Sequence, residues 1–150
     1  MLDLESYRDE SMPKTKWPKK VIVYTDGASR GNPGPASIGI FVTDEKQSEV
    51  ARFSEALGVQ TNNFAEYSAV IMALQQAHHH KIKEMTLRSD SELLIRQLKG
   101  EYKVKSETLR PLYEECIALI RKIGKVTFEH VRREFNKEAD KLANQALDGF

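Results

Sequence analysis

The order of the apolar blocks restricts the fold of this chain more than any other feature. Three strand-like blocks, at 21–26, 37–43 and 49–57, follow one another before any helical pattern begins. Beyond them, the periodicity predicts a helix that is capped at 61–63 and runs to about residue 79. It then predicts a strand at 85–90, helices at 92–98 and 109–123, a strand at 126–131 and a helix at 137–147. A sheet that alternates strand and helix from its start does not have this order.

Short links between the first three strands predict an antiparallel meander, whereas the helical crossovers that follow predict two strands parallel to the first. We therefore expect an α/β fold, with a mixed five-stranded sheet (a three-strand antiparallel meander plus two parallel strands) flanked by helices. The chain of 150 residues fits one domain, which we place at 21–150. Residues 1–20 are expected to form a flexible N-terminal leader, in which Trp17 belongs either to a solvated tail or to an arm that stacks on a base.

Composition excludes several classes of function. The formal net charge of +1 gives no argument from overall basicity for a nucleic-acid partner. The chain has no apolar run long enough to span a membrane and no secretory signal pattern, so a cytoplasmic location is expected. Cys116 is the single cysteine and is interpreted as a buried structural thiol. The three histidines at 78–80 are interpreted as a solvated helix end, because consecutive helical side chains cannot all bind one metal ion.

Four acidic residues are candidates for chemistry. Asp26 and Asp90 each end an apolar strand, Glu66 lies in the first turn of a helix, and Asp140 lies near the start of the last helix. If the two strands are adjacent and parallel, these carboxylates converge and repel one another unless hard divalent cations neutralise them. Two such ions can activate a water and hold a phosphate, which is nuclease chemistry. Taken singly, each acid also has a structural explanation as a turn former or a helix-terminal carboxylate.

Four segments resemble the motifs of the ribonuclease HI family in order and spacing: YTDGASRGNPGP at 24–35, TNNFAEY at 61–67, RSDS at 88–91 and NKEADKLA at 136–143. The resemblance covers about 21–147 and implies a ribonuclease H-like fold. It implies an endonuclease that hydrolyses the RNA strand of RNA–DNA hybrids and leaves 5′-phosphate and 3′-hydroxyl ends. The implied catalytic metal ligands, for two Mg²⁺ ions or Mn²⁺ as a substitute, are Asp26, Glu66, Asp90 and Asp140.

The resemblance also implies how substrate is held. The implied contacts to the hybrid are Gly27, Asn32, Thr61, Asn62 and Asn63. Glycine allows a close approach of the backbone, and amide side chains can meet ribose hydroxyls in a shallow minor groove. Turn formation and helix capping remain an alternative explanation for the asparagines. RNA–RNA duplexes are a further candidate substrate, and a monomer without membrane partners is expected.

Two features differ from many members of the family and resemble its short-loop subgroup. The segment 100–109 is too short for a basic, Trp-bearing protrusion, and no long loop with a histidine precedes Asp140. His130 falls within a strand, so no catalytic histidine is assigned. The hypothesis that replaces it is that Arg132 or Arg133 assists at the scissile or leaving phosphate.

Two alternative functions agree less well with the sequence. A non-catalytic hybrid-binding module of the same fold gains nothing from clustered negative charge facing phosphates. A phosphate-handling protein of the receiver or flavodoxin kind would open with alternating strands and helices, which the three consecutive strands contradict.

Overall fold

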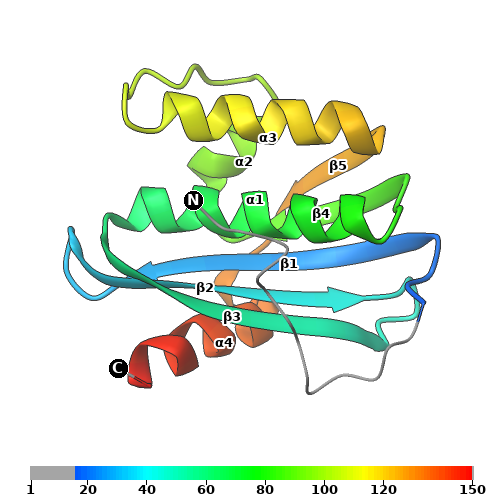
Figure 1. Ribbon diagram of the computed structural model, residues 1–150, viewed down its shortest axis with the longest axis horizontal. Coiled ribbons are helices and arrows are strands. Elements are labelled where there is room, and N and C mark those ends of the chain that lie inside the picture. Colours follow the sequence, from blue (N-terminus) through cyan, green and yellow to red (C-terminus); the bar gives the residue numbers. More distant parts are fainter. Residues whose placement is uncertain (1–15, 150) are drawn as a thin grey trace.

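The computed structural model describes residues 16–149 (Figure 1). Five strands and four α-helices follow the predicted order, with one additional 3₁₀ turn before the last helix. Their bounds are β1 Lys20–Ser29, β2 Gly34–Thr43, β3 Glu49–Gln60, α1 Asn62–His79, β4 Glu84–Ser89, α2 Glu92–Leu98, α3 Arg110–Ile123, β5 Lys125–His130, η1 Arg133–Phe135 and α4 Lys137–Asp148. No helix within the described residues is long and apolar enough to cross a membrane.

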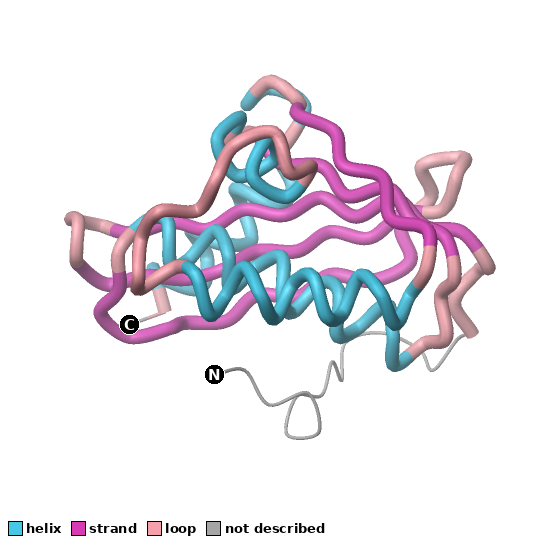
Figure 2. Tube along the Cα trace, turned by 90° about the horizontal axis from the view of Figure 1, so that it is seen from above, coloured by secondary structure: helices cyan, strands magenta, loops and turns pink. Residues whose placement is uncertain are grey.

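The strands form one mixed sheet in the order β3-β2-β1-β4-β5, and they run side by side in both views (Figures 1 and 2). β1 pairs antiparallel with β2, and β2 pairs antiparallel with β3. β4 pairs parallel with β1, and β5 pairs parallel with β4. The predicted meander and the two parallel strands are therefore confirmed.

Helices cover the two faces of the sheet unequally (Figure 1). α1 packs on β1 and β2, and α3 packs on α1 from outside. α4 packs on the opposite face against β2, β1 and β3. The α4 backbone approaches β2 very closely, because a Cβ atom added to Gly39 would lie 2.1 Å from the carbonyl oxygen of Ala139.

α1 begins at the predicted cap and is buried on more than one side. The Thr61 hydroxyl accepts a hydrogen bond from the amide of Phe64, which satisfies a free donor of the first turn. Tyr67, Val70, Ile71 and Leu74 are buried as predicted, whereas Phe64 is only partly buried. Since α1 lies between the sheet and α3, its burial exceeds the single stripe expected from the sequence.

The glycine-rich segment after Asp26 is more regular than predicted. It was expected to form a loop from 28 to 35, but β1 continues to Ser29 and β2 begins at Gly34. The amide of Arg30 donates to the carbonyl of Pro35 at 2.8 Å, so the turn is confined to the tip of a hairpin. Pairing with a neighbouring strand overrides the local turn preference of these residues.

Both sequence-based interpretations of Trp17 are wrong. The side chain is 8% exposed, belongs to the hydrophobic core and stacks on His80, with ring centroids 4.1 Å apart. Sequence patterning missed this contact because the partner lies far along the chain, at the end of α1. Of the expected leader, residues 1–15 lie outside the described residues.

We predict that Gly39→Ala destabilises the fold by about 1–3 kcal/mol, because the added methyl group overlaps the α4 backbone. Urea unfolding of the purified protein measures this change. Gly149→Ala is the matched control, since its added Cβ meets the nearest atoms at an ordinary 3.7 Å. Equal midpoints for the two variants would contradict the close packing of α4 on β2.

Candidate active site

Asp26 and Asp90 occupy equivalent positions on neighbouring strands. β1 and β4 are parallel, and their pairing ends with Tyr24 opposite Arg88. Asp26 and Asp90 each stand two residues further along, where the two strands are no longer paired. Asp26 does not end its strand as predicted, because β1 continues in its antiparallel pairing with β2. The parallel register still brings both acids to the same edge.

Two helices bring the other acids to this edge. A Cβ atom added to Gly27 would lie 2.3 Å from the backbone nitrogen of Glu66, so the start of α1 rests directly on β1. Glu66 lies just after the first turn of α1 and not within it as expected, because the helix begins at Asn62. α4 carries Asp140 in its first turn and packs on the other face of the same strands. The four acids therefore come from four different elements of the fold.

Electrostatics show that the four carboxylates interact. Asp26 is 8% exposed, and its pKa is raised from 3.8 to about 8. Burial is the largest cause, followed by the charges of Asp90 and Asp140, a hydrogen bond with Asp140 and the charge of Glu66. The pKa of Glu66 is raised to about 7, mainly by burial and also by the charge of Asp90, against the opposing effect of hydrogen bonds from Ser91 and Asn62. Such raised values are typical of carboxylates that share one site.

The donor chemistry of this site fits hard divalent cations, because all four groups are carboxylates. However, in residues 16–149 no three His, Cys, Asp or Glu side chains are arranged so that they could hold one metal ion as they stand. The Asp26–Asp140 hydrogen bond offers a reason, since a shared proton relieves the repulsion that a cation would otherwise relieve. The acids are brought together, but their oxygen atoms are not closed around a single point.

Asn136 holds the site together and was missed as an individual residue in the sequence. Its side chain is 1% exposed and donates a hydrogen bond from Nδ2 to the carbonyl of Thr25 at 2.9 Å, next to Asp26. Its own carbonyl accepts from the amide of Asp140 at 3.1 Å. One residue thus connects β1 to the start of α4. Although Asn136 directly precedes α4, its side chain makes no capping hydrogen bond.

The expected substrate contacts gather around the start of α1. Asn32, in the β1–β2 turn, accepts a hydrogen bond through its side-chain oxygen from the backbone amide of Asn62 at 3.1 Å. The side-chain amide of Asn62 donates to the carboxylate of Glu66 at 3.4 Å. Asn63 is exposed, and Thr61 caps the helix. Gly27 is different, because α1 covers the side where its Cβ would be. Its requirement for glycine is therefore explained by helix packing.

Arg132 and Arg133 lie in the short connection between β5 and α4. Both side chains are exposed, and Arg132 contacts Glu134 at 3.9 Å. The connection contains the 3₁₀ turn η1, which was not predicted. Because Asn136 follows this turn and connects to Thr25, the two arginines are attached to the site through a short and anchored segment.

Comparison with known proteins places this site in a family. Residues 24–146 match the family model described as reverse transcriptase-like. The chain is 40% identical to ribonuclease HI of Halobacterium salinarum over 86% of its own length and 65% of that protein. It is also 40% identical to the bifunctional protein Rv2228c of Mycobacterium tuberculosis, over 86% of its own length and 36% of that protein. It thus spans less than two thirds of these relatives.

Solved structures agree with the sequence matches. The crystal structure of the Halobacterium salinarum enzyme superposes with a TM-score of 0.84 at 39% identity, covering 87% of this chain and 99% of that one. LC11 ribonuclease H1, crystallised with an RNA/DNA hybrid, gives a TM-score of 0.82 at 41% identity, covering 86% of this chain and 97% of that one. With its mixed sheet, its converging acids and these matches, the chain belongs to the ribonuclease H family.

Proposed function

We propose that residues 21–150 act as a ribonuclease H domain that hydrolyses the RNA strand of RNA–DNA hybrids. The observation that carries this proposal is the meeting of Asp26, Glu66, Asp90 and Asp140 at one edge of the sheet. A relative 41% identical to this chain was crystallised with an RNA/DNA hybrid, which supports the choice of substrate. A module that only bound the hybrid would gain nothing from four carboxylates facing phosphates.

The four carboxylates would hold divalent cations, with two Mg²⁺ ions as the first choice and Mn²⁺ as a substitute. Bound cations would supply an activated water and stabilise the charge that develops on the scissile phosphate, leaving 5′-phosphate and 3′-hydroxyl ends. The side chains must give up the Asp26–Asp140 hydrogen bond to offer both carboxylates as ligands. Asn136 keeps β1 and α4 in place during this change, because its two hydrogen bonds involve the backbone of Thr25 and Asp140.

Residues around the start of α1 would hold the hybrid. Asn32 and Asn62 are connected by a hydrogen bond, so the β1–β2 turn and the helix present one polar surface. Asn63 is exposed beside them and can contact ribose hydroxyls or base edges. Thr61 and Asn32 would contact a DNA phosphate near the amides of the first helical turn. Gly27 would contribute by letting α1 lie close to the carboxylates.

Three further expectations remain predictions. Cleavage of RNA–RNA duplexes is tested as an arm of the assay below. The cytoplasmic location is tested by localisation measurements, and the monomeric state by sedimentation.

We predict that Asp26→Asn lowers hybrid cleavage by at least about a hundredfold, because it removes a carboxylate that all three other acids surround. The assay follows labelled RNA, free or paired to DNA or RNA, on gels with Mg²⁺, Mn²⁺ or chelator. Product mobility after phosphatase treatment reports which end carries the phosphate. Glu114→Gln is the matched control, since this glutamate is exposed on α3, which packs on α1 from outside. Equal cutting by the native chain and Asp26→Asn would refute the proposal.

We predict that stability in chelator falls as pH rises from 5 to 9. The pKa of Asp26 is raised to about 8 in the folded chain, whereas an unfolded aspartate titrates near 4. The folded state therefore binds the proton more tightly, and this stabilisation is complete below about pH 4 and lost as pH rises through about 8. The loss is on the order of several kcal/mol, and urea unfolding at each pH measures it.

In the same experiment, Asp26→Asn should be less sensitive to pH and more stable than the native chain at pH 9. Mg²⁺ should restore stability to the native chain at that pH, because a ligand that binds only the folded state stabilises it. Parallel pH profiles for the native chain and Asp26→Asn would show that the carboxylates do not interact as described.

We predict that replacing both Arg132 and Arg133 by alanine lowers turnover about tenfold, because a positive charge near the phosphate is lost. Both arginines are exposed, so thermal stability should stay within about 0.5 kcal/mol of the native value. Arg121→Ala, at the exposed end of α3, is the control for a general loss of positive charge. Unchanged turnover in the double variant would discard the hypothesis.

A further inference from the structure

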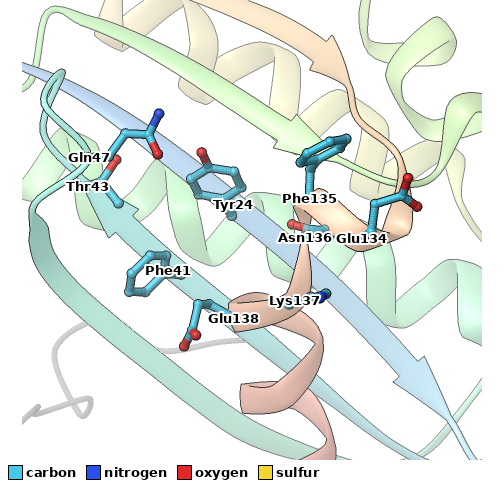
Figure 3. Close-up of a pocket in the computed structure, with 9 residues that line it drawn as sticks. All are labelled: Tyr24, Phe41, Thr43, Gln47, Glu134, Phe135, Asn136, Lys137 and Glu138. Carbon is cyan, nitrogen blue, oxygen red and sulfur yellow. The ribbon is translucent and has the colours of Figure 1, made fainter.

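A pocket of about 200 Å³ lies where the start of α4 meets β1 and β2 (Figure 3). It is formed by β1, β2, the turn after β2 and the segment 134–138. An engineered apolar cavity of about 150 Å³ binds benzene, whereas pockets for drug-sized ligands begin near 300 Å³. The pocket therefore has room for one flat ring system.

Aromatic rings form its walls. The rings of Tyr24 and Phe41 lie on neighbouring strands with their centroids 6.1 Å apart, and Phe135 stands across from them (Figure 3). Phe135 is 66% exposed, which is unusual for a phenylalanine and leaves its ring available for stacking. Arg88 lies over the ring of Tyr24 at 5.5 Å and holds its hydroxyl at 2.8 Å, so this wall is fixed.

The polar groups of the pocket call for a ligand that donates hydrogen bonds. Asn136 lines the pocket, and its Oδ1 is buried without a hydrogen-bond partner. Its Nδ2 donates to the Thr25 carbonyl, which settles which amide atom is the unpartnered one. Glu134 and Glu138 also line the pocket, but each is paired with an arginine: Glu134 with Arg132 at 3.9 Å and Glu138 with Arg52 at 3.7 Å. The unpartnered oxygen of Asn136 therefore favours a ring that carries N–H groups.

The distance from the pocket to the proposed active site is no greater than the length of one nucleotide. Tyr24 and Asp26 are two residues apart on β1 and point to the same face of the strand, which separates them by about 7 Å. A nucleotide with its phosphate at the carboxylates can therefore extend its base toward the aromatic walls. Bases within a duplex are already paired, so only an unpaired base can leave the stack at low cost.

We propose that this pocket binds an unpaired nucleobase of the RNA strand, at a mismatch or a strand end, next to the phosphate that is cleaved. This proposal rests on the proposed function, which places the scissile phosphate at the four carboxylates. It rests on the aromatic walls and the unpartnered Asn136 oxygen for the choice of a base. Hybrids with an unpaired nucleotide at the cleavage position should then be preferred over fully paired ones.

Adenosine is the probe for the pocket itself, titrated into the full ¹⁵N-labelled chain without metal. Saturable shifts are expected for the backbone amide of Phe135 and the side-chain amide of Asn136, and ribose or inorganic phosphate should not cause them. Phe135→Ala should weaken adenosine binding about tenfold, because one stacking contact is lost. Tyr102→Ala is the matched control, since Tyr102 is also an exposed aromatic residue and contacts Arg96 instead.

Unmoved Phe135 and Asn136 signals, equal shifts with phosphate, or equal adenosine affinity in Phe135→Ala would each overturn the proposal. A second measurement compares cleavage of a hybrid with one mismatch against its paired counterpart. The preference for the mismatch should fall in Phe135→Ala and persist in Tyr102→Ala. Adenosine binding requires no cleavage, so a chain that binds adenosine but cuts no hybrid would count against the proposed function alone.

Discussion

Parallel pairing between β1 and β4 brings Asp26 and Asp90 to one edge of the sheet, and the rest of the site depends on this register. The edge is costly to build, since burial and the charges of the neighbouring acids together raise the pKa of Asp26 to about 8. A fold that served only stability would place apolar side chains there. The retained cluster of acids is therefore explained by chemistry that requires negative charge, and divalent cations are the partners that such charge selects.

Two glycines make the convergence of the acids possible. Gly27 faces α1 and Gly39 faces α4, and they lie on adjacent strands, where Gly39 pairs with Asp26. Since neither carries a side chain, both helices approach the sheet until backbone meets backbone. Glu66 belongs to α1 and Asp140 to α4, so the two acids approach Asp26 from the two sides of the sheet. Gly27 thus has a structural role in helix packing, whereas the resemblance to the ribonuclease HI family implied a contact with substrate.

Asn136 connects the carboxylates to the neighbouring pocket. Its amide nitrogen fixes the start of α4 to β1, and its amide oxygen is left without a partner at the wall of the pocket. A buried unpartnered oxygen costs stability, and a ligand that donates to it would recover that cost. Asn136 would then contribute to both the phosphate site and the base site. This arrangement would link recognition of an unpaired base to the geometry of the carboxylates.

The sequence by itself determined the element order, the mixed sheet and the four acids, because apolar periodicity and turn chemistry act over a few residues. Thr61 as a helix cap and Cys116 as a buried thiol follow from the same local rules. Tertiary structure decided what depends on distant partners: Trp17 stacks on His80, Gly27 serves helix packing, and Asn136 joins β1 to α4. Burial and mutual repulsion shift the carboxylate pKa values only when the folded chain removes water and brings four separate elements together.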